Sequence, residues 1–519
     1  MTGQPLFSRR RMLELAALGP LSVSTLRHGL AQSNGKTLTV AIPAGPTTLD
    51  PINAVTHDPL VVTGSIFENL VEYDQDGVLK PQLAKALPEV SADKLIYTFD
   101  LRDDVQFHNG QKMTAEDVKY SFDSMLDPQR AAARRGVFAR IDKVEVDSPA
   151  RVRVYLKQPY APWVYFLTKY MGIWPKDSRE KLGDEHFKLH PSGVGTGPGM
   201  FEEWRPNEYV SLRRNPNYWQ QGLPRWEKLV VKIVPEDATR VAYLMTGQAD
   251  IIGAPPPRDF ARLKSQRGIT GAQRPTLGGW SVMLCNTARP PFDDVNFRKA
   301  IAYGVDRETI AKDVFFGLVH PATVPAPPGS WWYDEKADHV VRYDPEQARA
   351  YLAKSKYPNG AEFDVSVPAT PYLLDMKDAA VVVQAQLQKL GIKPNIKLQE
   401  PNVVVQSYIR GEHHATMANI MSPGEATYLI MVNFMQDQVM TRTSNYSNPR
   451  IDQLMTKIFA DSDGEKLKPL FSQLMTIFAE EQPYIWLGFF DVSNLWRDSV
   501  KNFKVNQGLS LMVRDVVPT

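Results

Sequence analysis

In the segment 95–101 every second residue is hydrophobic, and polar residues occupy most of the positions between. This period of two is typical of a strand with one buried face. Asn109-Gly110 then provides a turn. Thr114 and Asp117, three residues apart, form a capping box, and Phe122 belongs to the hydrophobic face behind it. This stretch therefore predicts a strand, a turn and a capped helix.

Similar alternation recurs through the first half of the chain and predicts a strand-rich region. The further predicted strands are Thr37–Ile42, Val144–Val146, Arg151–Leu156, Tyr209–Leu212 and Leu229–Val234. A helix-like stretch with Ile66, Phe67 and Leu70 follows Asp58.

The second half of the chain has helical periodicity with clear start and stop signals. Asn448-Pro449 predicts an N-cap followed by proline at the first helical position, and the hydrophobic residues of 451–459 follow at helical spacing. A second such face runs from Leu467 to Phe478, and a third, which includes Val383, ends at Gly391. These faces are expected to be buried in a protein core.

At 519 residues the chain is too long for one hydrophobic core, so we expect two or more domains. The composition changes near Gln273–Trp280, and Tyr484–Phe490 is a hydrophobic, strand-like stretch near the end. We expect the chain to cross between two domains at these two places. The first domain is then discontinuous and is closed by the carboxyl-terminal segment.

The charge balance excludes two classes of partner. The chain has a net charge of +2, but its first 31 residues contain four arginines and one glutamate, so the remainder has a net charge of −1. A nearly neutral protein has no electrostatic attraction to nucleic acid or to anionic lipid.

The amino-terminal residues fit a twin-arginine export signal. Ser8–Leu13 includes three consecutive arginines, and the hydrophobic run Leu13–Leu26 follows. Small residues precede a cleavage position after Ala31, and the run is too short to span a bilayer. The alternative is a basic, disordered start that binds an acidic partner. A signal over residues 1–31 and a periplasmic location are the prediction.

Cys285 is the only cysteine. It excludes an intramolecular disulfide and any zinc or redox site built from several cysteines. Because no cysteine follows the predicted signal, we expect no lipid anchor there.

Several segments, in this order and spacing, resemble one known family. The strand, turn and helix at Tyr97–Tyr120 are similar to the signature of the family 5 extracellular solute-binding proteins. These are the peptide-, opine- and nickel-binding receptors of ABC importers, of the dipeptide- and oligopeptide-binding type. The further matching segments are Gly195–Pro198 with Arg214–Pro216 and Tyr218-Trp219, then Leu244–Ile251, Phe292–Ile310 and Tyr343–Gly360.

The resemblance implies an α/β fold of two lobes, of the class II, cluster C type, with an extra subdomain inserted in the first lobe. The boundaries that we expect are 32–275 for lobe I, including the subdomain at about 58–185, then 276–488 for lobe II and 489–519 for the return to lobe I. It also implies that a solute binds between the lobes, that the lobes close by a hinge motion, and that the closed form docks on a membrane permease driven by cytoplasmic ATPases. We expect a monomer without a cofactor.

Two departures from the family pattern bear on the ligand. Dipeptide-binding members hold the peptide amino group with an Asp in a Gly-Trp-x-x-Asp-like stretch, which here reads NIMSPGEAT over Asn419–Thr427. They hold the carboxylate with an Arg just before a Tyr, and here Tyr372 is present but Pro368–Pro371 contains no Arg. A buried carboxylate without a cation is costly. The sequence therefore predicts a neutral, larger or partly aromatic ligand.

The residues expected to contact the ligand come from four places in the chain. They lie in the loop after the first strand, at the crossing between domains, near the missing Arg, and in the stretch that replaces the Asp motif. These candidates are Thr47, Thr48, Trp280, Tyr372, Ile420, Met421, Ser422 and Glu425.

Three alternatives remain at this point. An enzyme lacks support, because no G-x-S-x-G, P-loop or H-E-x-x-H motif occurs. A nickel or metal-chelate receptor would need histidine ligands, but His413-His414 and His186/His190 are the only clusters, and we expect exposed, non-ligating histidines there. A periplasmic chaperone or signalling receptor could use the same cleft.

Overall fold

The computed structural model describes residues 36–54, 60–133, 135–160, 163–328, 330–369, 374–421, 426–436, 438, 440–461, 464–506 and 511–518. The predicted export signal and three of the expected ligand contacts, Tyr372, Ser422 and Glu425, lie outside these residues. Among the described residues, no helix has both the length and the apolar character needed to cross a membrane.

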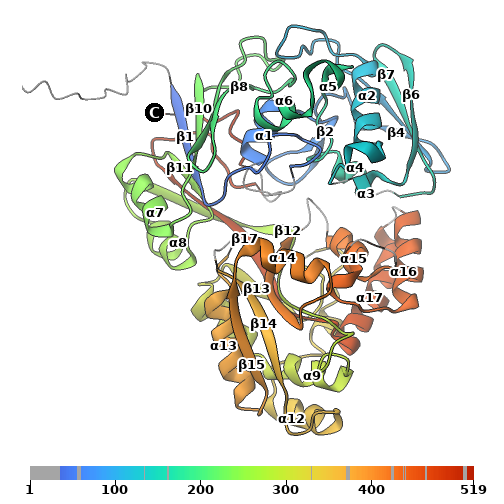
Figure 1. Cartoon of the computed structure of the whole chain (residues 1–519), viewed down its shortest axis with the longest axis vertical. Coiled ribbons are helices and arrows are strands. Elements are labelled where there is room, and N and C mark those ends of the chain that lie inside the picture. Colours follow the sequence, from blue (N-terminus) through green and yellow to red (C-terminus); the bar gives the residue numbers. More distant parts are fainter. Residues whose placement is uncertain are drawn as a thin grey trace, which may run out of the picture. The chain divides into compact units, whose positions relative to one another are not determined.

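One large mixed sheet runs through the described chain in the order β15-β14-β16-β12-β17-β11-β1-β10-β9-β8, with β13 paired to β17 (Figure 1). Its strands are β1 Thr37–Ile42, β8 Gly199–Arg205, β9 Tyr209–Arg214, β10 Lys228–Ile233, β11 Ile251–Gly253, β12 Ile269–Cys285, β13 Val319–Pro321, β14 Glu362–Pro368, β15 Lys393–Gln399, β16 Ala415–Met421 and β17 Tyr484–Arg497. We call β8, β9, β10, β1 and β11 the first half-sheet and β14, β15 and β16 the second half-sheet. The predicted strand Thr37–Ile42 is confirmed.

The two longest strands, β12 and β17, join the half-sheets. They pair from Ile269↔Arg497 to Pro275↔Asp491, and again from Trp280↔Phe489 to Leu284↔Tyr484, with a register shift between the two runs. β11 pairs with the first run of β17, and β16 pairs with the second run of β12. The chain thus crosses between half-sheets in the two regions where the sequence predicted crossings.

A smaller antiparallel sheet lies within the first half of the chain, in the order β4-β5-β7-β6. Its strands are β4 Glu89–Val90, β5 Ile96–Asp100, β6 Ile141–Ser148 and β7 Arg151–Leu156, and a separate pair is formed by β2 Val71–Tyr73 and β3 Leu79–Pro81. Helix α2, Ala115–Leu126, packs against β6 and β7 and begins with the predicted capping box, in which the Thr114 amide donates to the Asp117 carboxylate at 2.7 Å. The strand, turn and capped helix read from 95–122 are confirmed.

Helices cover the sheets. In the first half they are α1 Leu60–Ile66, α3 Arg135–Phe138, α4 Trp163–Phe166, α5 Ser178–Leu182, α6 Asp184–Leu189, α7 Asp237–Thr246 and α8 Pro257–Leu263, with the 3₁₀ turn η1 Pro128–Arg130. In the second half they are α9 Val295–Gly304, α10 Arg307–Thr309, α11 Glu335–Asp338, α12 Pro345–Lys354, α13 Lys377–Gln388, α14 Pro401–Ile409, α15 Ala426–Phe434, α16 Pro449–Ala460 and α17 Gly464–Glu481, with the π-turn η2 Ile310–Val314 and the 3₁₀ turn η3 Thr441–Thr443. Helix α13 packs on β14 and β15 (Figure 1). The side chain of Asn448 caps α16, as predicted.

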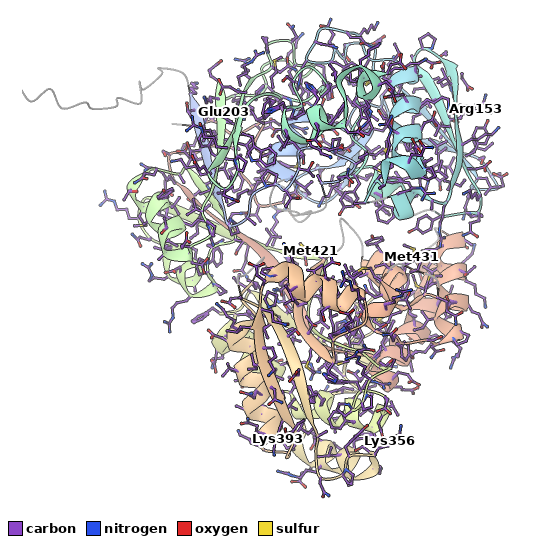
Figure 2. All side chains as sticks on the ribbon, viewed as in Figure 1. Arg153, Glu203, Lys356, Lys393, Met421 and Met431 are labelled. Carbon is purple, nitrogen blue, oxygen red and sulfur yellow. The ribbon has the colours of Figure 1, made fainter. Side chains whose placement is uncertain are left out.

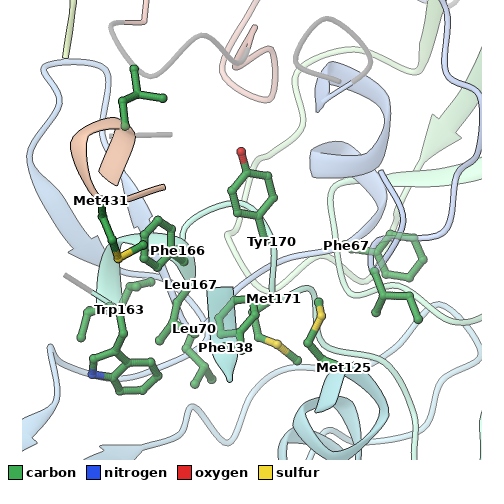
Figure 3. Close-up of a cluster of buried hydrophobic side chains, with 14 of the residues drawn as sticks. Phe67, Leu70, Met125, Phe138, Trp163, Phe166, Leu167, Tyr170, Met171 and Met431 are labelled. Atoms are coloured by element: carbon green, nitrogen blue, oxygen red, sulfur yellow. The ribbon is translucent and has the colours of Figure 1, made fainter. Parts of the chain in front are cut away.

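Aromatic side chains of α4 and of the segment between β7 and α4 contact α15 and α16. The Tyr160 hydroxyl lies 3.2 Å from Sδ of Met431 on α15, and the Tyr160 ring packs edge-on against Phe459 of α16 at 4.8 Å. Phe166 of α4 packs against Tyr428 of α15 at 4.8 Å. Figure 3 shows Met431 beside Phe166 and Trp163 in this hydrophobic cluster.

Three of the segments that carried the family resemblance meet at one point near the end of α1. The His108 amide donates to the Gly195 carbonyl at 2.8 Å, and Nε2 of the same histidine lies 2.9 Å from the Gly197 carbonyl. Nδ2 of Asn215 donates to that same Gly197 carbonyl at 3.0 Å. These contacts join the turn before α2 to the segments that flank β8 and β9.

One ion pair beside the crossing makes stability depend on pH. Nε2 of His320, on β13, lies 2.8 Å from a carboxylate oxygen of Asp491 on β17, and this hydrogen bond raises the pKa of His320 above its usual 6.5. Protonated His320 therefore stabilises the fold fully below about pH 6.5, and the contribution disappears as pH rises through the raised pKa.

We accordingly expect the melting temperature of His320→Gln to lie furthest below that of the wild type near pH 6 and to approach it near pH 8. Thermal unfolding of both proteins across this range measures the difference. A difference that stays constant with pH would show that the Asp491 contact does not depend on the imidazolium charge.

Candidate ligand-binding site

The loop after β1 is held in place by a buried ion pair. Asp50 accepts hydrogen bonds from both terminal nitrogens of the Arg179 guanidinium at 2.6 and 3.1 Å, and both side chains are at most 1% exposed. The guanidinium also stacks over Trp174 at 4.7 Å and Phe187 at 4.1 Å. The Thr48 hydroxyl accepts from the Asp50 amide at 3.1 Å. The buried ion pair with Arg179 therefore fixes the position of the loop after β1.

The carboxyl ends of the first half-sheet's parallel strands share one edge. β1 runs parallel to β10 and β11, so Ile42, Ile233 and Gly253 end near one another. β11 runs antiparallel to β17, with Gly253 opposite Asn494. The carboxyl ends of β1, β10 and β11 therefore point along β17 toward its lower-numbered residues. Those residues of β17 pair with the part of β12 that joins the second half-sheet.

The second half-sheet presents its own carboxyl edge in the opposite direction. β14 and β16 are parallel, and β16 pairs with β12 so that Trp280 faces Ile420 and Gly279 faces Met421. In Figure 2, Met421 at the end of β16 and Lys393 at the start of β15 mark opposite edges of this half-sheet. β16 therefore ends toward the register shift of β12 between Pro275 and Trp280.

The two carboxyl edges consequently face each other across the crossing strands. Along β17, the residue opposite the end of β11 is Asn494, and Phe489 is opposite Trp280 beside the end of β16. Ligands of α/β sheets bind outside the carboxyl ends of strands, where loops supply the contacts. The facing edges define the candidate ligand-binding site.

A cavity of about 90 Å³ lies beside the first of these edges. Its wall includes Pro51 and Ala54 from the loop after β1, and Leu511 from the carboxyl-terminal segment. Leu511 is close to the strand ends, because a Cβ built on Gly253 would lie 3.5 Å from Cδ1 of Leu511 and 3.5 Å from Cγ2 of Ile42. The cavity therefore opens next to the carboxyl edge of the first half-sheet.

Glu68 is the most deeply buried acid in the cavity wall, with no exposed surface. It accepts hydrogen bonds from the Tyr218 hydroxyl at 2.7 Å and from Nε1 of Trp219 at 2.9 Å. Burial raises the pKa of Glu68 to about 7. The Tyr218-Trp219 pair, which carried part of the family resemblance, thus donates to an acid whose pKa burial raises.

Among the described residues, the other charged groups of the wall are Glu72, Arg514 and Lys169. Arg514 donates two hydrogen bonds to Glu72 at 2.7 and 2.8 Å, which ties the carboxyl-terminal segment to β2. Lys169 is partly buried, and burial lowers its pKa to about 7. Of the ligand contacts predicted from the sequence, none that the structure describes lies in this cavity wall. The available signals were an acid within the hydrophobic stretch 60–70 and a lysine within the hydrophobic stretch 163–174.

Comparison with known proteins decides the family. The family model described as "Bacterial extracellular solute-binding proteins, family 5 Middle" matches residues 78–440, which is more than half of the chain. The chain belongs to this family. The resemblance inferred from its motifs is confirmed.

Similar proteins cover nearly the whole chain of this family 5 protein. The glutathione-binding protein GsiB of Salmonella typhi is 28% identical over 481 residues, covering 91% of this chain and 92% of the relative. The solved AgaA from A. tumefaciens R10, in complex with agropinic acid, is 26% identical with a TM-score of 0.82, covering 92% of this chain and 98% of AgaA. Helicobacter pylori DppA, in complex with the peptide STSA, has a TM-score of 0.84 at 24% identity, covering 93% and 98%. The predicted two-lobed α/β fold of class II, cluster C type is confirmed.

Three of the residues expected to contact ligand lie together in this family 5 protein. Trp280 is directly opposite Ile420, and Met421 is the next residue of β16. Ile420 is partly exposed, Met421 is 8% exposed, and Trp280 is fully buried between Phe434 and Trp486, with ring centroids at 6.4 and 5.9 Å. In the loop after β1, Thr47 is exposed and Thr48 is partly exposed. A direct ligand contact by any of these residues stays a prediction.

The histidine clusters differ from expectation at one position. His413 was expected to be exposed, but it is 4% exposed, and burial lowers its pKa to about 4. It lies just before β16. Nε2 of His186 lies 2.9 Å from the Ser192 carbonyl, and His190 is exposed. Within the described part of the chain, no three His, Cys, Asp or Glu side chains are grouped so that they could hold a metal ion.

Proposed function

We propose that this protein is the periplasmic substrate-binding component of an ABC importer, and that it captures a small organic, peptide-like solute and delivers it to a membrane permease. The observation that carries the proposal is the pair of carboxyl edges that face each other across β12 and β17. A solute placed there contacts both half-sheets at once. Its binding energy then favours the closed arrangement.

The hinge in this proposal is the register shift of β12 between Pro275 and Trp280. The domain boundaries 32–275, 276–488 and 489–519 follow from placing the hinge there and at the corresponding part of β17. A two-state closure biased 1:99 toward the open form needs about 5.5 kcal/mol of differential binding energy to be reversed. A few hydrogen bonds and one buried aromatic contact are of that size.

The names of the relatives support the ligand class. GsiB is a glutathione-binding protein, and AgaA was solved with agropinic acid. Both ligands are small organic solutes with amide or acid groups. We further propose that a twin-arginine signal at residues 1–31 directs export of the protein. We also propose that the exported protein is a monomer.

The test is to purify the protein natively and identify any retained solute by mass spectrometry of the denatured protein. A thermal-shift panel of glutathione, Met-Leu, the peptide STSA, agropinic acid and the nickel–histidine complex then measures binding. A true ligand at a hundredfold excess over its Kd raises the free energy of unfolding by about 2.7 kcal/mol.

The result expected is one panel class that raises the melting temperature and displaces the retained solute in stoichiometric amount. Chemical turnover of the retained solute by the purified protein would contradict a receptor role. If only the nickel–histidine complex raises the melting temperature, the ligand is a metal chelate and not a peptide-like solute.

A further inference from the structure

Side chains that belong to different lobes also contact each other outside the crossing strands. The smaller sheet and α4 precede β12 in the chain, whereas α15 and α16 lie between β12 and β17. Contacts between these two groups of elements therefore join the two lobes that the proposed domain boundaries define. We call the residues that make these contacts the latch, and its members are Lys94, Arg140, Tyr160, Phe166, Tyr428, Met431, Phe459 and Ala460.

One part of the latch is a cation that faces two aromatic rings. The Arg140 guanidinium lies 4.3 Å from the ring centroid of Tyr160 and 5.4 Å from that of Phe459. The two rings meet edge to face with their centroids 4.8 Å apart, so one guanidinium faces a ring from each lobe. Both rings are almost fully buried. A cation is attracted more strongly to a ring that is shielded from water than to an exposed ring.

Hydrophobic contacts accompany this cation. Phe166 packs against Tyr428 with ring centroids 4.8 Å apart, and the Tyr160 hydroxyl lies 3.2 Å from Sδ of Met431. Phe166 and Met431 are almost fully buried and lie side by side in Figure 3. Separation of the lobes would bring these side chains into contact with water, which is unfavourable. The hydrophobic contacts therefore favour the arrangement in which the lobes touch.

Lys94 caps the carboxyl end of α16 from the other lobe. Its ammonium donates to the Ala460 carbonyl at 3.0 Å and lies 3.7 Å from the Asp461 carboxylate. Ala460 is the last residue of α16, where carbonyls have no partner within the helix and the helix dipole attracts a cation. Lys94 lies in the turn before β5. This turn is therefore tied to a helix of the second lobe.

The backbone of Lys94 has a conformation that lysine rarely adopts. Its φ is 59°, in the left-handed region that favours glycine, and its amide closes the turn onto the Ser91 carbonyl at 2.8 Å. Glycine would fit this turn at a lower conformational cost, so the turn itself gives no reason for a lysine. The contact of the ammonium with α16 gives that reason.

We propose that the latch holds the two lobes together before a solute binds, with Arg140 bridging the two rings and Lys94 capping α16. The inference rests on the proposed function and adds a second set of contacts that controls closure. Because the latch already favours closure, a solute needs less differential affinity to close the lobes. The latch residues are therefore positioning residues, which act on capture through the arrangement of the lobes.

The experiment measures the distance between the lobes in the full chain without solute. Ser148→Cys at the end of β6 and Lys457→Cys on α16 carry nitroxide spin labels, because both positions are exposed. The native Cys285 is fully buried, so the labelling reagent does not reach it. Unfolding, dialysis and refolding remove any retained solute. Double electron–electron resonance then gives the populations of shorter and longer distances between the labels.

The variants of Arg140 have a matched control within the smaller sheet. Arg140→Met removes the cation, and Arg140→Lys keeps a cation at this position. Lys143→Met removes a cation that lies 4.7 Å from the Tyr155 ring, a contact between β6 and β7 that does not join the lobes.

The variant of Lys94 has its own control at the same carboxylate. Lys94→Gly removes the cap of α16 and suits the left-handed backbone of the turn. Lys466→Met removes a second cation near Asp461, at 4.0 Å, which comes from α17 of the same lobe.

We expect the wild type and both controls to show mainly the shorter distance. Arg140→Met should raise the ratio of longer to shorter distances about tenfold, which corresponds to about 1.4 kcal/mol. Arg140→Lys should raise this ratio less. Lys94→Gly should raise it about threefold, because the Lys94 ammonium and its partner are partly exposed. The double variant Arg140→Met/Lys94→Gly should show both distances.

Mainly the longer distance in the wild type would overturn the proposal, as would a double variant that shows only the shorter distance. An effect of Lys143→Met as large as that of Arg140→Met would also overturn it, since the change would not then come from a contact between lobes. Where Arg140→Met does not fold, Lys94→Gly decides, and an unchanged ratio in this variant contradicts the latch.

The outcome is separable from that of the proposed function, because the distances are measured without a solute. No stabilising ligand in the thermal-shift panel, together with lobes that are held in the wild type, would remove the receptor role and leave the latch. A stabilising ligand, together with mainly the longer distance in the solute-free wild type, would leave the receptor role and remove the latch.

Discussion

Replacing Asp50 with alanine is expected to lower the free energy of unfolding by about 3–5 kcal/mol, because it removes the buried counterion of the Arg179 guanidinium and leaves it only the half-exposed Asp184 carboxylate. The Arg179 side chain has no exposed surface, and Asp50 accepts from both of its terminal nitrogens. Chemical denaturation at equilibrium measures the change.

The matched control acts on the same arginine. Asp184 accepts from Nη1 of Arg179 at 3.1 Å, but its side chain is 50% exposed. Asp184→Ala should therefore cost less than about 1 kcal/mol. Equal losses in the two variants would show that burial of the Asp50 pair does not determine its contribution.

The same replacement should also weaken ligand binding. Asp50 organises the loop after β1, since the Ile52 amide donates to it at 3.2 Å and its own amide donates to Thr48. Loosening this loop adds an ordering cost to binding. The affinity of Asp50→Ala for the solute identified in native purification should fall, whereas that of Asp184→Ala should not change.

Gly195→Ala is the second change with a large expected effect, a loss of about 3 kcal/mol or more in the free energy of unfolding. A Cβ at this position would lie 2.0 Å from the Ile66 carbonyl oxygen and 2.8 Å from the Ile66 carbonyl carbon. Both are backbone atoms at the end of α1, so no side-chain rotation relieves the overlap. Equilibrium unfolding of the variant measures the loss.

Gly64→Ala provides the control within the adjoining helix. Gly64 is exposed on α1, and nothing lies within 4 Å of a Cβ built there. Alanine favours a helix over glycine by roughly 1 kcal/mol, so this variant should be as stable as the wild type or more stable. A stable Gly195→Ala protein would mean that α1 can move away from the Gly195–Pro198 segment.

Local structure was predictable from nearby residues. The strand Arg151–Leu156 has the predicted bounds, and Asn448 caps α16 as expected. The capping box at Thr114 and the family signature around it also agree with the structure. These features depend on residues within about four positions of one another, so side-chain periodicity and capping chemistry suffice to specify them.

Exposure and partners were less predictable. His413 was expected to be exposed and non-ligating, yet its side chain is buried. The ring of Trp280 packs between Phe434 and Trp486, neighbours that the sequence did not identify, and its contact with ligand stays a prediction. Which face of a strand is covered depends on elements that pack on it from other parts of the chain, and periodicity does not identify those elements.

The sequence by itself determined the family, the secondary structure around its motifs and the two regions where the chain crosses between half-sheets. Only the tertiary structure decided which strand ends face each other, through the register of β12 with β17 and β16. It alone placed Glu68, Asn69, Lys169 and Arg514 around one cavity. These residues are separated by up to several hundred positions, and only the packing of distant segments brings such groups within reach of a single ligand.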